Sequence, residues 1–277
     1  MNPVGKALWF IESHYASDIT LEDIAEAGGV SRYHLSRAFA AATTHSLMAY
    51  VRGRRLSEAA RTLVAGAPDI LAVALDAGYG SHEAFTRAFR EQFGLTPEAA
   101  RAQGSLAKLT LVEPLKMTES LLSSLETPRI VQGPPLLIAG LSQHYDAASC
   151  AGIPAQWQRF VPYLGRITGQ IGNVSYGVCY NGDDAGHIDY LCGVEVRDIS
   201  ALPADWSHVR INAQTYAVFQ HREHISTIRQ TWNTIWNSWF PQSGYRPARA
   251  PDFERYDERF NGSTGQGGLE IWVPIQT

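Results

Sequence analysis

The sequence predicts a multi-domain chain: an all-α double helix-turn-helix domain followed by an α+β domain of duplicated strand-helix-strand-strand units. Its 277 residues suit two domains. Leu, Ile and Val recur at helical spacings through residues 1–101, whereas from Pro128 β-branched and aromatic runs alternate between turn residues. Each part also contains an internal repeat. We place the helical domain at 1–104, a linker at 105–127 and the α+β domain at 128–277.

Composition excludes several classes of protein. Hydrophobic residues make up 45% and charged residues 18% of the chain, which is ordinary for a globular protein and argues against disorder. The longest apolar runs, such as Pro134–Leu141, are far shorter than the roughly 20 residues that span a bilayer. No secretory signal is visible, and the three cysteines lack CxxC spacing. We therefore expect a cytoplasmic protein with reduced thiols, no metal site and no membrane partner.

The helical part begins with a helix, a glycine turn and a second helix. Thr20 and Asp23 are spaced as a capping box at the start of a helix over Thr20–Ala27. Gly28 and Gly29 end this helix, because glycine readily adopts the left-handed backbone of a helix C-terminus. Ser31 then caps a second helix. The apolar face of that helix is Leu35, Ala38 and Phe39. This order is the signature of a helix-turn-helix motif.

A second copy of this arrangement follows a connecting helix over Leu47–Val64. Asp69 caps its first helix, Gly78 ends that helix, and Ser81 caps the second one. The apolar face of the last helix is Phe85, Ala88 and Phe89. A plain helical bundle is the alternative for either copy alone. Two copies with matching caps, glycines and apolar anchors favour paired helix-turn-helix motifs.

Residues 8–101 resemble the DNA-binding domain of the AraC/XylS family. The resemblance implies a monomeric domain whose two recognition helices enter successive major-groove segments on one face of DNA. The segments that carry it are Leu21–Ala25, Ser31–Arg37, His45–Leu47, Tyr50–Arg52, Arg54–Leu56, Ala77–Ser81, Phe85–Arg90 and Phe93–Pro97.

On each recognition helix, the side opposite the apolar anchors is expected to enter the groove. Arg can bond guanine at two points, Ser or Thr either base edge, and Glu the cytosine amino group. A solvated helix face is the alternative for any one of them. Arg37 and Arg87 are favoured because they occupy equivalent positions. The base-reading candidates are Arg32, Tyr33, Ser36, Arg37, His82, Glu83, Thr86, Arg87 and Arg90. The phosphate-binding candidates are His45, Arg52, Arg54 and Arg55.

The net charge does not argue against DNA. The whole chain carries −4, yet binding depends on local rather than net charge. Residues 1–104 hold 10 basic and 11 acidic side chains, so this half is nearly neutral and must segregate its charges. We expect modest affinity for double-stranded DNA and steep salt dependence.

The second part reads as an approximate duplication. The first half has a strand over Arg129–Leu141, a helix over Ile153–Ile167, and strands near Val174–Tyr180 and Ile188–Val196. The second half has a strand over His208–Gln220, a helix over His224–Phe240, and strands near Phe253–Glu258 and Leu269–Ile275. Hairpin turns rich in Gly, Asp and Asn stand at matching places.

This arrangement resembles the GyrI-like effector-binding domain. The resemblance implies a concave site between the two halves that binds small, often cationic and lipophilic, molecules. The segments that carry it are Tyr176–Val178, Gly193–Val196, Tyr216–Phe219, Phe253–Tyr256 and Leu269–Pro274.

Two acids interrupt apolar strands, and a buried acid among aromatic rings suits a lipophilic cation. Glu270 is the first choice and Glu195 the second. The alternatives are an ion pair of Glu270 with an arginine such as Arg222, and an exposed sheet face for Glu195. The aromatic wall candidates are Trp157, Tyr163, Tyr176, Tyr180, Tyr190, Phe219, Tyr256 and Trp272. The tryptophans Trp232, Trp236 and Trp239 have helical spacing, which favours the core.

The expected partners are DNA and a small-molecule effector, with RNA polymerase as a candidate third. We expect no cofactor and no enzymatic activity, because an operator-reading module serves a sensor rather than a reaction. Two alternatives stay open. Glu270 as a base beside a tyrosine could hydrolyse electrophilic compounds, as some GyrI-like domains are thought to do. The C-terminal domain could instead bind only proteins.

Overall fold

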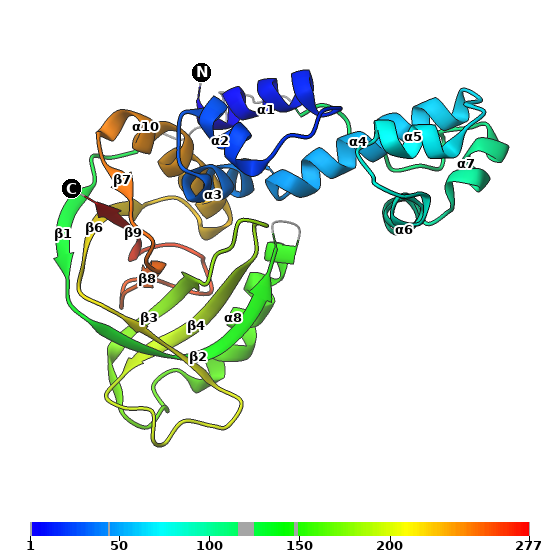
Figure 1. Cartoon of the computed structure of the whole chain (residues 1–277). Coiled ribbons are helices and arrows are strands. Elements are labelled where there is room, and N and C mark those ends of the chain that lie inside the picture. The colour runs from blue at the N-terminus through cyan, green and yellow to red at the C-terminus, as the bar shows by residue number, and fades with distance from the viewer. Residues whose placement is uncertain (1, 44, 116–124, 147–148, 277) are drawn as a thin grey trace. The chain divides into compact units, whose positions relative to one another are not determined.

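The computed structural model describes residues 2–43, 45–115, 125–146 and 149–276. Internal contacts divide them into two compact units (Figure 1). The N-terminal unit comprises residues 3–32 and 47–115. The C-terminal unit comprises residues 33–46 together with 125–276. The second helix of the first helix-turn-helix motif therefore groups with the C-terminal unit.

Helices build the N-terminal unit. The long helix α4 packs against α5, α6 and α7, and α1 packs against α2. A core around Leu56, Leu63, Phe85 and Phe89 fills the part of the unit that holds the second motif. The bounds are α1 Pro3–His14, α2 Leu21–Gly28, α4 Leu47–Val64, α5 Ile70–Asp76, α6 His82–Phe93 and α7 Pro97–Gln103. Among the described residues, no helix is long and apolar enough to cross a membrane.

The helix caps predicted at Thr20, Asp69 and Ser81 are confirmed. The Asp23 backbone N–H donates to the Thr20 hydroxyl (3.2 Å), and the Thr20 N–H donates to the Asp23 carboxylate (2.8 Å). This is the reciprocal capping box of α2. Gly29 ends that helix with φ 72°. Asp69 and Ser81 cap α5 and α6 by accepting backbone N–H groups of the first turn.

The first part of the predicted linker belongs to the N-terminal unit. Residues 105–115 follow α7 without regular secondary structure. The backbone N–H of Val112 donates to the Ser57 hydroxyl (2.9 Å), and that of Leu115 donates to the Tyr50 hydroxyl (2.9 Å). Leu109 is buried. These bonds and this burial fix the segment against α4.

The described residues of the C-terminal unit form a nine-stranded antiparallel sheet. Its order is β1-β6-β9-β8-β3-β4-β2-β5, and β7 also pairs with β9. The bounds are β1 Arg129–Gly133, β2 Leu136–Tyr145, β3 Gln170–Tyr180, β4 Ile188–Val196, β5 Ser207–Ile211, β6 Gln214–His221, β7 Arg246–Pro247, β8 Asp252–Tyr256 and β9 Leu269–Gln276.

The two halves of the sheet exchange one strand each. The predicted strand over Arg129–Leu141 is two strands, because Gly133 is followed by two prolines that cannot donate to a ladder. The predicted strand over His208–Gln220 is likewise split, at residues 212–213. β1 then pairs with β6 of the second half, and β5 pairs with β2 of the first. The halves β2-β4-β3 and β6-β9-β8 meet where β3 pairs with β8.

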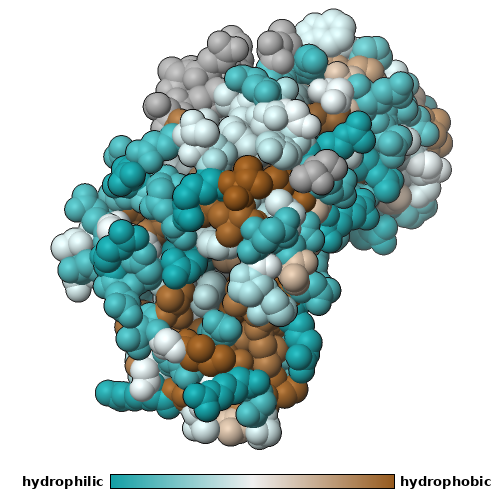
Figure 2. Space-filling view, turned by 90° about the vertical axis from the view of Figure 1, so that its left-hand side faces the viewer, coloured by the Kyte–Doolittle hydropathy of each residue, from teal (hydrophilic) through white to brown (hydrophobic). Residues whose placement is uncertain are grey.

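Each face of the sheet carries a buried core. On the helix face, Phe160 of α8 packs with Tyr190 and Cys192. On the opposite face, Tyr176, Tyr216 and Phe253 form a second core. The helices are α8 Ile153–Phe160, α9 Ile228–Thr234, a π-helical turn Ile235–Trp239 and α10 Phe240–Ser243. At the surface shown in Figure 2, brown apolar patches are separated by teal polar side chains.

Candidate functional site

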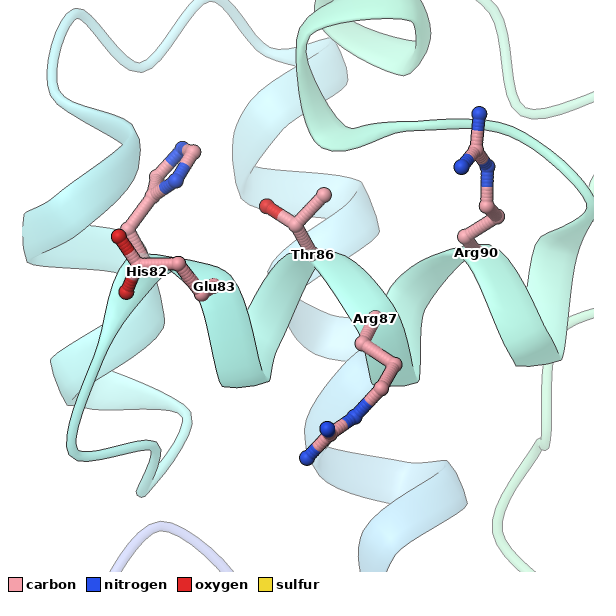
Figure 3. A pocket seen from close by; sticks show the side chains of 5 residues that line it. All are labelled: His82, Glu83, Thr86, Arg87 and Arg90. Atoms are coloured by element: carbon pink, nitrogen blue, oxygen red, sulfur yellow. The ribbon is translucent and has the colours of Figure 1, made fainter.

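α6 presents a charged surface to solvent. Phe85 and Phe89 are buried beneath it, and Glu83, Arg87 and Arg90 are exposed. These three, with His82 and Thr86, line an open pocket (Figure 3). All five are base-reading candidates from the sequence, so the structure brings the whole second set together.

The side chains of this pocket point in more than one direction. In Figure 3, His82, Thr86 and Arg90 extend along one edge of α6 and Arg87 extends on the opposite side. His82 Nε2 lies 3.0 Å from a carboxylate oxygen of Glu98. The buried Thr86 hydroxyl has no hydrogen-bond partner among the described residues. The exposed guanidinium groups of Arg87 and Arg90 suit contact with base edges and phosphates.

α3 (Arg32–Ala42) is placed differently. Only Arg32 is exposed along this helix, and it pairs with Glu22 at 3.2 Å. Ser36 is buried, and Tyr33 and Arg37 are half-buried. Arg37 Nη2 donates to both carboxylate oxygens of Asp252, at 2.7 and 2.6 Å. The open groove-facing side expected for α3 is not observed, because groups of β8, α9 and the π-helical turn Ile235–Trp239 contact it. A DNA contact by these residues stays a prediction.

Arg54 is buried in an ion-pair network. Its side chain is 5% exposed. The guanidinium Nη2 donates to Glu12 (3.0 Å), and Nη1 donates to Glu58 (3.0 Å). Its charge is therefore already neutralised inside the N-terminal unit. This placement corrects the expectation that Arg54 faces phosphate.

The other phosphate candidates differ in how far they reach solvent. Arg55 is half-buried, and its Nε donates to the Tyr15 carbonyl (2.6 Å). His45 is half-buried. Arg52 is exposed on α4, so it is the best placed of the set for a phosphate contact.

The ligand-site candidates do not converge on one place. Alternation along the strands puts Tyr190, Phe219 and Tyr256 on the helix face, together with Trp157 of α8. The remaining strand candidates lie on the opposite face. They are Glu195, Glu270, Trp272, Tyr176 and Tyr180.

Glu270 is already neutralised by its neighbours. It is 5% exposed. Its carboxylate accepts from Arg129 Nη2 (2.5 Å), from Arg255 Nη1 (3.3 Å) and from the Trp272 indole (3.0 Å). The arginine named as a rival partner, Arg222, instead pairs with Glu126. Glu270 therefore forms structural ion pairs with Arg129 and Arg255, which is the alternative to a ligand-binding acid.

The other opposite-face candidates have structural contacts. Glu195 is half-buried on β4, and burial raises the pKa of its carboxyl. In the core, Tyr176 meets Phe253 edge to face and Trp272 stacks on Phe253, with ring centroids 5.8 and 5.4 Å apart. On the same face, the Tyr180 hydroxyl bonds to Ser142. Tyr163 lies outside the strands and is exposed beside Trp206.

A carboxylate that the sequence reasoning missed stands on the helix face. Glu254 of β8 is 7% exposed. Its Oε2 accepts from the hydroxyls of Tyr190 and Tyr256, both at 2.8 Å. Its Oε1 accepts from the Trp232 indole N–H (3.2 Å), and the Trp157 indole donates to the Tyr190 hydroxyl (2.9 Å). We call these five residues the Glu254 cluster.

The Glu254 cluster contains no cation. Among the described residues, no Lys, Arg or His forms an ion pair with Glu254. Burial raises the pKa of its carboxyl, the bonds from Tyr190, Tyr256 and Trp232 oppose this, and the charge of Asp252 adds to it. Burial also raises the tyrosine pKa values well above their usual range, so both hydroxyls remain neutral donors. The indoles of Trp157 and Trp232 are half-buried above this charge.

A glycine makes room for the cluster where the two halves meet. Gly177 of β3 pairs with Glu254. A Cβ at position 177 would lie 2.0 Å from the Tyr190 hydroxyl and 2.8 Å from the Glu254 carboxylate. Tyr176–Val178 and Phe253–Tyr256 both appear among the segments that carry the GyrI-like resemblance. A glycine in the first segment and an acid in the second were the sequence signal that could have pointed to Glu254.

Residues 126–276 match the family described as a GyrI-like small molecule binding domain. The chain belongs to the GyrI-like family. Residues 24–103 of this GyrI-like protein match a helix-turn-helix domain. Both resemblances drawn from the sequence motifs are thereby confirmed, and the N-terminal domain is of the AraC type.

Three curated relatives resemble the GyrI-like protein, one over nearly its whole length and two over part of it. Transcriptional regulator Rob of Salmonella typhimurium is 26% identical over 281 residues, which cover 97% of this chain and 96% of Rob. Transcriptional regulator BrlR of Pseudomonas aeruginosa is 30% identical over 53% of this chain and 54% of BrlR. Multiple antibiotic resistance protein MarA of Escherichia coli is 33% identical over 38% of this chain and 84% of MarA. The GyrI-like protein is thus a DNA-binding transcriptional regulator with a small-molecule-binding domain.

Proposed function

We propose that this regulator senses a lipophilic organic cation at Glu254 and reads its operator chiefly through α6. The observation that carries the ligand proposal is a buried carboxylate whose three donors are neutral aromatic side chains. A buried charge is costly unless an opposite charge compensates it. Because the protein supplies no cation there among the described residues, a ligand is the natural source.

The aromatic residues define what kind of cation fits. Indole and phenol rings attract a cation by about 0.5–2 kcal/mol each, and more strongly when water is excluded. Trp157 and Trp232 are half-buried, and their indoles bond to the Tyr190 hydroxyl and to the buried Glu254. A ligand that reaches the carboxylate must therefore turn these indoles aside and stack against them. A hydrated inorganic ion gains nothing from such walls, whereas an aryl-substituted cation does.

The test is a calorimetric titration of the full chain with tetraphenylphosphonium, followed in parallel by tryptophan fluorescence. We expect binding to the wild-type protein and at least tenfold weaker binding to Glu254→Gln, which corresponds to about 1.4 kcal/mol. The substitution keeps the shape of the side chain and removes its charge.

The matched control is Glu270→Gln. Glu270 is also a buried acid, but two arginines neutralise it, so we expect unchanged binding. Triphenylphosphine oxide, a neutral aryl compound, should bind measurably to neither the wild type nor the variants. Equal affinity of wild type and Glu254→Gln for tetraphenylphosphonium would refute the proposed site.

The same geometry favours one second candidate activity. Glu254 lies 2.8 Å from each of two neutral tyrosine hydroxyls, so a base and an acid stand together as hydrolysis of an electrophile requires. Turnover of an aryl epoxide that disappears in Glu254→Gln would support this hydrolase. The relatives support the sensor, and RNA polymerase is its candidate protein partner at a promoter.

A further inference from the structure

α3 is held along its length inside the C-terminal unit. Two of the groups that hold it come from the π-helical turn, a form of helix that is frequent at functional sites. A third comes from α9. The hydrogen bonds are His34 Nε2 to the Trp236 carbonyl (2.8 Å), Asn237 Nδ2 to the Ala38 carbonyl (3.0 Å) and Arg229 Nη2 to the Ala40 carbonyl (3.0 Å).

Arg37 is the centre of this contact. Its guanidinium donates to both carboxylate oxygens of Asp252, a residue that is 1% exposed. The guanidinium also lies over two indole rings, 5.5 Å from the centroid of Trp236 and 5.9 Å from that of Trp232. A carboxylate offers arginine the same planar pair of acceptors that guanine offers in the major groove. Asp252 therefore uses the donors of Arg37 that DNA would use.

We propose that β8, α9 and the π-helical turn compete with DNA for one face of α3, with Asp252 as the protein's substitute for the DNA acceptor. In the held state, α6 alone is free to enter a groove. In the released state, both helices bind. Because only the released fraction binds fully, the held state lowers the apparent affinity for DNA.

The Glu254 cluster is connected to this contact through a shared strand and a shared indole. Asp252 and Glu254 are two residues apart on β8 and lie on the same face. Trp232 donates to Glu254 and carries Arg37 on its ring. A cation at Glu254 turns Trp232 aside and adds positive charge near Arg37, and both changes weaken the hold on α3. This second part rests on the proposed function, and it gives the sign: the ligand promotes DNA binding.

The first experiment tests the hold without any ligand. A duplex is enriched from a random-sequence pool by the full wild-type chain, and its affinity is measured by mobility shift. We expect Asp252→Asn to bind it at least tenfold more tightly than wild type. Arg229→Ala, a change at an exposed side chain, should tighten binding by a smaller factor. Arg222→Ala, an exposed arginine that pairs with Glu126, should bind as wild type does.

The variants keep the result decisive. If Asp252→Asn fails to fold, Arg229→Ala still reports on the hold, because its side chain bonds to α3 from the surface. Unchanged or weaker DNA binding by whichever of these variants folds overturns the competition. Tighter binding by Arg222→Ala as well would also overturn it, since the gain would then reflect lost surface charge.

The second experiment adds tetraphenylphosphonium. We expect it to tighten DNA binding by the wild type at least threefold, and to change neither Asp252→Asn, which is already released, nor Glu254→Gln. If calorimetry shows binding of the cation but DNA affinity does not change, the coupling is wrong while the ligand site stands. If the cation does not bind at all, the proposed function fails, and the Asp252→Asn result still decides the competition.

Discussion

α3 and α6 are the two equivalent recognition helices of one repeated motif, yet the structure gives them opposite surroundings. In α6, the side opposite Phe85 and Phe89 is open, and its arginines reach solvent. In α3, the corresponding side contacts β8, α9 and the π-helical turn, and Arg37 is paired with Asp252.

The difference teaches that the same local sequence logic can build a helix without deciding which of its faces is available. The Ser81 cap specifies where α6 begins, and apolar anchors specify what both helices bury. What covers the remaining face depends on residues far away in the sequence. For α3, those residues belong to β8, α9 and the π-helical turn.

The largest expected effect on DNA affinity comes from removing the arginines of α6 rather than that of α3. Arg87→Ala combined with Arg90→Ala should weaken binding to the enriched duplex roughly 30-fold or more, because a guanidinium on a base edge contributes about 1–3 kcal/mol. Arg37→Ala without ligand should not weaken binding, since Asp252 already occupies that side chain and its removal also loosens the hold on α3. Mobility shifts at two salt concentrations measure both.

Comparable losses in the two variants would show that α3 is free in solution, and the comparison between the helices would collapse. Arg101→Ala serves as the control, because its guanidinium bonds to the carbonyls of Ala67 and Pro68 within the N-terminal unit.

A smaller effect is expected from pH. The pKa of the Glu254 carboxyl is raised above its ordinary value of 4.5 chiefly by burial, so it takes up its proton at a higher pH than a free glutamate. Cation affinity should be full above the raised pKa and fall by about tenfold per pH unit below it. Calorimetry across this range measures the loss.

Glu254→Gln should show weak binding with no such pH dependence. A pH profile that persists in Glu254→Gln would assign the titration to another group, with the neighbouring Asp252 as the first to examine, because burial raises its pKa too while Arg37 opposes the rise.

The smallest effect concerns two serines. Ser81→Ala removes the hydroxyl that accepts the Ala84 N–H at the start of α6, and should destabilise that helix by about 1 kcal/mol. Ser36→Ala removes a buried hydroxyl of α3 that has no partner among the described residues, and should leave stability unchanged or slightly higher. Hydrogen exchange of the two helices distinguishes these outcomes, and faster exchange in α3 would contradict the second.

Much of the helical half could be predicted because its signals are local. A capping box such as Thr20 with Asp23 acts across one turn of chain, and α4 has the bounds Leu47–Val64 that the sequence analysis gave for it. The burial of Arg54 could not be predicted, since Glu12 approaches from a distant helix. Charge at a position does not reveal whether a partner already neutralises it.

The sheet was harder because both of its faces are covered. In β8, Phe253 alternates with Asp252 and Glu254, and this alternation on its own predicts that the two acids lie on a solvent-exposed face of the sheet. All three are buried. Glu270 and Glu254 look alike as acids in apolar strands, and only the arginines across the sheet separate them.

The exchange of β1 and β5 makes the C-terminal domain indivisible. A fragment that ended before β5 would leave β2 with an open edge, which invites pairing with other chains. It would also lack Trp232, Glu254 and Tyr256, whereas a fragment that began after β4 would lack Tyr190 and Trp157. Neither half of the repeat is therefore complete on its own. Separating the halves by proteolysis should abolish both the binding site and the fold.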